Sequence, residues 1–170
     1  GLATRERMER TERKASETAQ LLGELRKAKY TPGIALNDWL EKHHQPEVQN
    51  GLSAVELLKR PEITLSALAE LSPEIRQFGK PAQEQAEISV KYEGYLERQE
   101  TLIRHARQME ETLLPEDLPY EEVTGLRIEA RQKLMKQRPR SLAAASRIPG
   151  VSPADVAVLM VFLEKHKGNA

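Results

Sequence analysis

The segment RPRSLAAASRIPGVSPADVAVLMVFLE, residues 138–164, contains two helix stops, two helix starts and a tight turn. Ser141 can cap a short helix that Pro149-Gly150 ends, because Pro lacks an amide hydrogen and Gly accepts turn conformations. Ser152 can cap the next helix, with Pro at its first position and Asp at its third, as in a capping box. The segment therefore predicts two helices joined by a tight turn, the second burying Val156, Leu159, Met160 and Leu163.

Similar start and stop signals divide the rest of the chain. Ser53 followed by Glu56 forms a capping box, and Ser72 precedes Pro and Glu in another start signal. No segment shows the sustained period-two alternation of a half-buried strand. The sequence therefore predicts an all-α fold, a helical bundle with further helices over 4–29, 34–42, 81–113, 120–124, 128–137 and 141–148.

The segment 81–113 is the longest periodic one and predicts a long central helix. Apolar residues recur along it in alternating steps of four and three, a heptad-like seam. We expect this seam to pack against neighbouring helices of the bundle, because the other segments also need a surface to cover. Leu114-Pro115 ends the helix, which places a helical subdomain over 1–113 and a smaller subdomain of three to four helices over 114–170. The seam consists of Ile88, Tyr92, Tyr95, Gln99, Leu102, Ala106, Met109 and Leu113.

Composition excludes several classes of function. The 170 residues include 26 basic and 26 acidic ones, and this neutral balance argues against a general polyanion binder. Aromatic residues make up only 4% of the chain, too few for a base-stacking surface. Without Cys there are no disulfides or thiolate metal sites, and the adjacent His43 and His44 lack further ligands at a suitable spacing. Because no nucleotide-binding glycine loop or catalytic set is present either, we expect no metal, cofactor or reaction in this chain.

The termini and the apolar runs indicate where the protein works. The N-terminus is charged rather than apolar, unlike a signal peptide. The longest apolar run, 156–163, is too short to span a bilayer. With the absence of Cys, these features predict a cytoplasmic protein without a membrane partner. The sequence opens with Gly1-Leu2 inside a charged helical pattern, so we interpret it as a piece of a longer protein.

The N-terminal segment 4–29 is polar and rich in helix formers. Its thin apolar stripe is expected to dock along one side of the fold. Its Arg and Lys residues could form a basic arm, but interleaved Glu residues favour a solvated helix. The stripe consists of Met8, Ala15, Ala19, Leu22 and Leu25.

Positive charge is concentrated between residues 127 and 147. This basic block has seven Arg and Lys residues against Glu129 alone, which makes it a candidate surface for an anionic partner. Solvated charge is an equally good interpretation for any one member. The adjoining segment 148–155 also resembles a helix-hairpin-helix turn, although Ser152 and Asp155 favour a simple capped turn between helices. The block consists of Arg127, Arg131, Lys133, Lys136, Arg138, Arg140 and Arg147.

Several motifs resemble one known family in their order along the chain. Residues 56–64 read ELLKRPEIT and residues 88–99 read ISVKYEGYLERQ. They are followed by Leu-Pro at 114–115, Arg-Pro at 138–139 and ASRI at 145–148. Together these motifs are similar to the C-terminal helical region of the flavoproteins that modify the wobble uridine of tRNA at carbon 5, the glucose-inhibited division protein A family. The resemblance covers essentially the whole chain.

The resemblance implies that the chemistry lies outside these residues. In the family, an N-terminal domain carries FAD and uses NADH, and the enzyme, expected to be a homodimer, works with a GTPase partner on tRNA. The helical C-terminal region is associated with docking of the GTPase and contact with tRNA. We therefore expect a non-catalytic docking domain. The alternative is a structural scaffold or dimerisation domain of the parent flavoprotein without direct tRNA contact.

The candidate contacts under this resemblance are cationic and apolar. Val158 and Phe162 are expected to pack on the GTPase where the core does not need them. The chain departs from the family pattern in two places, because Ala143-Ala144 replace a Gly-Gln pair and Arg127 replaces a capping Ser. Contact with tRNA phosphate, the GTPase or both is expected from six members of the basic block, Arg131, Lys133, Lys136, Arg138, Arg140 and Arg147.

Overall fold

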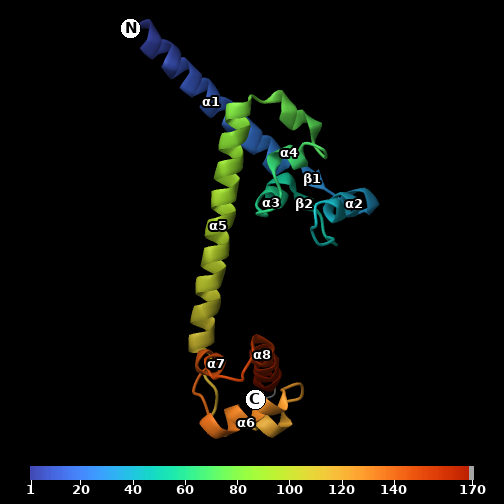
Figure 1. The fold of residues 1–170 in the computed structure, drawn as a ribbon, viewed down its shortest axis with the longest axis vertical. Helices are drawn as coiled ribbons and strands as arrows, with labels where there is room; N and C mark the ends of the chain where they lie inside the picture. Colours follow the sequence, from blue (N-terminus) through green and yellow to red (C-terminus); the bar gives the residue numbers. More distant parts are fainter. Residues whose placement is uncertain (169–170) are drawn as a thin grey trace. The chain divides into compact units, whose positions relative to one another are not determined.

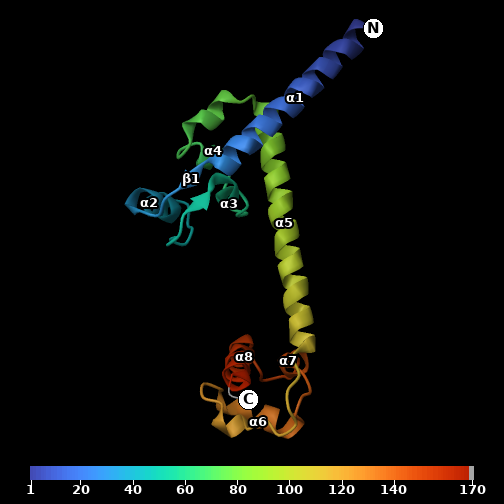
Figure 2. The ribbon, with the colours of Figure 1, turned by 180° about the vertical axis from the view of Figure 1, so that it is seen from behind.

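The computed structural model describes residues 1–168, which contain eight α-helices, two 3-10 helices and one small sheet (Figures 1 and 2). The all-α prediction is confirmed, since the sheet takes only two residues from each strand. The chain forms two compact units, unit 1 over Gly1–Arg98 and unit 2 over Gln99–Ala170, each with its own apolar core. The division falls inside the long helix α5 (Lys80–Glu111), whereas the helix-stop signal at 114–115 places a boundary at the end of that helix.

Unit 1 is built from short elements between two long helices. The strands pair in antiparallel fashion, with Lys29 opposite Ser53 and Tyr30 opposite Leu52. The core is formed mainly by Leu side chains of α1 to α4, together with the buried Trp39. The elements are α1 (Leu2–Lys27), β1 (Lys29–Tyr30), α2 (Ile34–Lys42), β2 (Leu52–Ser53), α3 (Ala54–Leu58), α4 (Leu65–Leu68), the 3-10 helix η1 (Pro73–Gln77) and the first part of α5.

Local capping explains most helix starts in unit 1. The predicted capping box at α3 is confirmed, with the Glu56 amide donating to Ser53 Oγ over 3.2 Å. Thr64 caps α4, a helix that the sequence patterns do not predict. The predicted cap at Ser72 is wrong, because its side chain is buried and hydrogen-bonded to the Tyr30 hydroxyl, and η1 begins there without a side-chain cap.

The apolar stripe predicted for α1 is only partly correct. Leu25 is buried and Leu22 packs partly against the core of unit 1, but Met8 is 60% exposed. Thr18 and Leu21, one turn before these leucines, are the other buried positions of α1. The core of unit 1 therefore meets only the C-terminal half of α1, which leaves the N-terminal half polar and exposed.

The seam predicted along α5 is wrong over most of its length, because its bulky members other than Met109, which is half-buried against the core of unit 2, face outward. Within unit 1, Ile88 and Tyr92 are each 62% exposed and Tyr95 is 52% exposed. The buried face consists instead of small residues spaced by four, Ala82, Ala86, Val90 and Gly94. Small side chains allow a neighbouring backbone to approach closely. The packed face of α5 is therefore the one with small residues, and the larger apolar residues lie on the other side.

Gly94 shows how close this approach is. A Cβ atom at this position would lie 3.0 Å from the carbonyl oxygen of Lys59 and 3.1 Å from the Lys59 Cβ. The Arg98 guanidinium donates to the same carbonyl over 3.0 Å. The end of α3 is thus held directly against α5.

Lys91 completes this contact. Its Nζ donates to the backbone carbonyls of Leu58, at 2.7 Å, and of Arg60 and Ile63. The Leu58 carbonyl belongs to the last residue of α3 and the other two follow it, beyond the regular hydrogen bonds of the helix. Burial lowers the pKa of Lys91, although the charges of Glu87 and Glu62 oppose that shift. The sequence motifs at 56–64 and 88–99 therefore contact each other, where the end of α3 packs on α5.

Unit 2 packs short helices around the chain that leaves α5. The Leu142 amide at the start of α7 donates to the Thr112 carbonyl over 3.0 Å, and the Leu114 amide donates to the Arg140 carbonyl over 2.8 Å. The predicted capping serines at 141 and 152 both cap their helices, which confirms those starts. The elements are the 3-10 helix η2 (Tyr120–Glu122), α6 (Ile128–Gln137), α7 (Leu142–Ser146) and α8 (Pro153–Lys167).

Residues 1–168 contain no candidate membrane span and no cluster of metal-ligating side chains. No described helix combines the length and the apolar character needed to cross a bilayer. No group of three His, Asp or Glu side chains in this part of the chain is placed to hold a metal ion. His43 instead packs on the Trp39 ring, with centroids 4.4 Å apart, and its Nε2 lies 3.5 Å from a Glu70 carboxylate oxygen.

Candidate docking surface of unit 2

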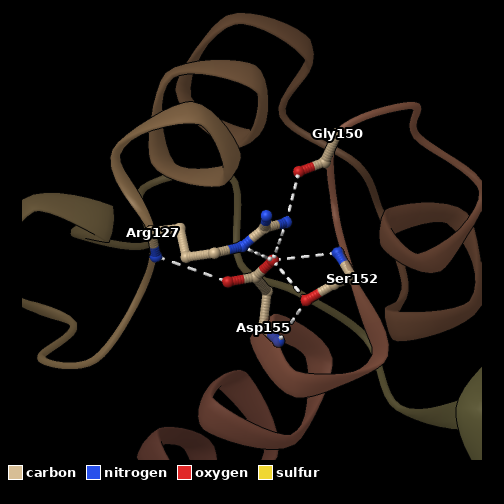
Figure 3. A network of polar contacts seen from close by, with 4 residues as sticks. All are labelled: Arg127, Gly150, Ser152 and Asp155. Carbon is tan, nitrogen blue, oxygen red and sulfur yellow. Dashed lines mark hydrogen bonds and ion pairs between the residues drawn. The ribbon is translucent and has the colours of Figure 1, made fainter.

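A buried carboxylate organises the start of α8 (Figure 3). Asp155 is only 1% exposed, and it accepts hydrogen bonds from the Ser152 amide and hydroxyl, both at 2.8 Å. The Arg127 guanidinium donates to the same carboxylate over 2.9 Å and also to the Gly150 carbonyl over 3.0 Å. This network joins the start of α6 to the turn before α8.

The electrostatics of Asp155 follow from these contacts. Burial by itself raises the pKa of Asp155, but the hydrogen bonds from Arg127 and Ser152 outweigh it and hold the pKa well below its ordinary value. The carboxylate therefore stays ionised and completes the capping box that begins α8 at Ser152.

This arrangement decides between the two interpretations of the turn at 148–155. A phosphate at the start of α8 would compete with Asp155 for the Ser152 amide. Gly150 takes a φ of +94°, where a side chain would be strained and a Cβ would meet the Glu129 carboxylate at 2.8 Å. The segment is a capped turn between helices, as Ser152 and Asp155 indicate.

Arg127 has a different role from the one its charge suggests. Its side chain does not cap α6, in agreement with the loss expected from the departure at this position. The Asp155 carboxylate accepts the amide of Arg127 itself over 3.3 Å. The guanidinium charge is thus paired within unit 2.

Three more arginines of the basic block also make contacts inside unit 2. Arg131 donates to the Val123 carbonyl over 3.1 Å. Arg147 forms an ion pair with Glu110 on the last turn of α5. Arg138, the third, contacts the linker that follows α5.

Arg138 holds the acidic linker that follows α5. Its Nη1 donates to the carbonyls of Leu118, over 2.8 Å, and Glu116, over 3.1 Å. Its guanidinium carbon lies 5.2 Å from the centroid of the buried Tyr120 ring. Arg138 itself ends α6 in a left-handed conformation with a φ of +46°.

The remaining cations of the basic block are free. Lys133 and Lys136 lie one turn apart on the exposed side of α6, and Arg140 lies in the loop before α7. Within residues 1–168, their side chains form no hydrogen bond or ion pair with the protein. They are the members of the block that are available to a partner.

An open groove runs beside α8. It has a volume of about 460 Å³, and its floor is formed by apolar side chains of one face of α8. Val161 is 51% exposed there, whereas Val158 and Phe162 are half-buried. Charged groups of both signs stand at its rim. The lining residues are Glu122, Thr124, Ala157, Val158, Val161, Phe162 and Lys165.

The structure thus brings Val158 and Phe162 to the same groove and adds Val161. Val158 also supports the turn at Gly125, where a Cβ would lie 3.4 Å from its methyl group, and Phe162 stacks on His166 with centroids 3.9 Å apart. Val161 stands three residues after Val158, a helical spacing that is visible in the sequence. The signal is weak because α8 is apolar on nearly every side between 156 and 163. Val156 and Leu159 are buried as predicted, and Met160 and Leu163 are half-buried.

Two family models match the chain. The tRNA modifying enzyme MnmG/GidA C-terminal helical domain matches residues 5–100, more than half of the 170. The tRNA modifying enzyme MnmG/GidA C-terminal helical bundle matches residues 102–170. The chain belongs to the MnmG/GidA family. The two matches of the MnmG/GidA models correspond to units 1 and 2, and they confirm the resemblance seen in the sequence motifs.

Curated relatives carry the name tRNA uridine 5-carboxymethylaminomethyl modification enzyme MnmG. The MnmG of Alkaliphilus metalliredigens is 41% identical over 168 residues, 98% of this chain and 26% of its own length. That of Syntrophobacter fumaroxidans is 43% identical over 145 residues, 85% of this chain and 23% of its own. The form II crystal structure of Aquifex aeolicus GidA is 25% identical and has a TM-score of 0.38, covering 93% of this chain and 24% of that one. The chain spans about a quarter of the length of these MnmG relatives.

Proposed function

We propose that the chain is the non-catalytic docking domain of a flavoenzyme that modifies the wobble uridine of tRNA at carbon 5. The groove beside α8 receives the partner GTPase, and the free cations of the basic block contact tRNA phosphate or the GTPase. The reaction takes place in the part of the protein outside these 170 residues, where FAD and NADH bind in a homodimeric enzyme. The MnmG names of the relatives support the tRNA uridine assignment.

One observation carries the docking role: an apolar groove that is open to solvent lies on unit 2, although the unit has a complete core of its own. Exposed valine beside partly exposed phenylalanine, with polar and charged groups at the rim, is the composition of a protein interface. On the same unit, Lys133 and Lys136 of α6 carry unpaired charge, which suits either a phosphate or an acidic surface of the GTPase.

Replacing Val161 by Asp is expected to weaken binding of the GTPase by about tenfold or more, because it places a charge on an apolar contact. Val161 is 51% exposed, so the fold should tolerate the change. Ile128→Asp is the matched control, since Ile128 is 75% exposed and lies outside the groove. Calorimetric titration with the purified GTPase measures the affinity, and circular dichroism checks the helices. A folded Val161→Asp protein that binds as well as the control contradicts the assignment of the groove.

Reversing two free cations, Lys133→Glu with Lys136→Glu, is expected to weaken binding of tRNA or of the GTPase by about tenfold at low salt. Arg138 is unsuitable for this test, because its substitution would also release the Leu118 carbonyl. Arg104→Glu with Arg107→Glu makes the same change in charge on the exposed side of α5 and serves as control. Unchanged affinity for both partners would favour the alternative, a scaffold or dimerisation domain without tRNA contact.

A further inference from the structure

Unit 1 has a second groove, far from the basic block in sequence. It extends along α1 from Arg7 to Glu17, up to the place where the middle of α1 crosses the start of α5 (Figures 1 and 2). Its volume is about 380 Å³. Its lining consists of Arg7, Arg10, Thr11, Arg13, Lys14, Glu17, Gly79, Pro81 and Ala82.

The groove is lined mainly by the basic residues of α1, a helix in which basic and acidic residues alternate along the sequence. Arg7, Arg10 and Lys14 follow one another at steps of three and four, so they share a face of α1. Glu9 and Glu12 fall between them in sequence and are absent from the lining. Glu residues alternate with Arg and Lys along the sequence of α1. The face of α1 that lines the groove nevertheless carries mainly Arg and Lys.

The groove cations are not neutralised by the protein. Within residues 1–168, none of Arg7, Arg10, Arg13 and Lys14 forms an ion pair. The single carboxylate in the lining, Glu17, accepts the Gly79 amide over 3.0 Å at the start of α5. This carboxylate offsets the partial positive charge of that helix end, so the positive potential of the groove comes from the four basic side chains.

We propose that this α1 groove binds the phosphate backbone of an RNA. Arg and Lys side chains are the groups that most often position nucleic-acid phosphates, and four of them line the groove. A protein interface would need aromatic or large aliphatic anchors at its centre, and the lining contains none. The inference rests on the proposed function, which supplies tRNA as the RNA, and adds a contact on unit 1 to those on unit 2.

The test measures binding of an unmodified tRNA transcript to the whole chain by fluorescence anisotropy between about 50 and 200 mM salt. Arg10→Glu with Lys14→Glu is expected to lower the affinity about tenfold at the low-salt end and to reduce the slope of log affinity against log salt by about 1.5, because two phosphate contacts are lost. Arg5→Glu with Arg76→Glu makes the same change in charge outside the groove and is expected to shift the affinity by less than about twofold.

The possible outcomes distinguish failure of the inference about the α1 groove from failure of the proposed function. If the groove variant binds tRNA with the affinity and slope of its control while Lys133→Glu with Lys136→Glu weakens binding, the inference falls and the proposed function stands. If only the groove variant loses affinity, the inference stands and tRNA contact by unit 2 falls. A groove variant that loses the GTPase but keeps tRNA overturns the inference in favour of an acidic protein partner. Absence of tRNA binding by the unaltered chain overturns it as well.

Discussion

Replacing Lys91 by Met is expected to lower the free energy of unfolding of unit 1 by about 3 kcal/mol, which reduces its folding equilibrium constant more than a hundredfold. The Lys91 ammonium is the common donor to the carbonyls of Leu58, Arg60 and Ile63. Methionine has a similar length but no donor, so these carbonyls would lose a charged partner in a partly buried place. The loss far exceeds the small change in helix propensity between Lys and Met.

The protein carries its own probe for this change. Trp39, the only Trp of the chain, is buried in the core of unit 1, so its fluorescence follows unfolding of that unit. Denaturant titration of Lys91→Met should move the fluorescence midpoint strongly downward. Lys80→Met at the exposed start of α5 should stay within about 0.5 kcal/mol of the unaltered chain. Equal midpoints for the two variants would show that the contact of Lys91 with the end of α3 contributes little.

Replacing Asp155 by Ala is expected to destabilise unit 2 by about 3 kcal/mol at neutral pH. The change removes the Asp155 half of the capping box of α8, which is the acceptor for the Ser152 amide, and it removes the partner of Arg127. Alanine offers none of these, and the amide of Ser152 would stay half-buried without an acceptor. Amide hydrogen exchange in α8 measures the loss, and the Trp39 fluorescence transition of unit 1 serves as internal control.

The stabilisation that Asp155→Ala removes is expected to depend on pH. The folded pKa of Asp155 lies below its ordinary value of 3.8, so the carboxylate contributes stability that is complete above about pH 5. That contribution declines as the pH falls below about 4 towards the lowered folded pKa. The difference in stability between the unaltered chain and Asp155→Ala should therefore shrink between pH 7 and pH 3. A difference that stays constant over this range would contradict the charged network.

Helix starts were predictable because capping is local. The bounds predicted for α2 and α6, 34–42 and 128–137, agree with the structure, as do the capping serines at 53, 141 and 152. Each such signal involves hydrogen bonds between residues three or four positions apart. Ser72 shows the limit, because a hydroxyl group that a distant tyrosine can reach is no longer available as a cap.

The candidate site was only partly predictable. Val158 and Phe162 do line the groove beside α8, but Arg127, Arg131, Arg138 and Arg147 use their charge within unit 2. The sequence does not distinguish a paired cation from a free one, because a partner such as Asp155 lies 28 residues from Arg127.

The sequence alone determined the helical class, the places where helices begin and end, and the membership in the MnmG/GidA family, because these depend on short segments and their order. Only the tertiary structure decided which faces are buried and which charges are free. Gly94 and Lys91 pack against a backbone more than 25 residues earlier, and this long-range contact overrides the apolar seam of α5. Burial and pairing depend on what lies opposite a side chain, and that neighbour is brought there by the fold.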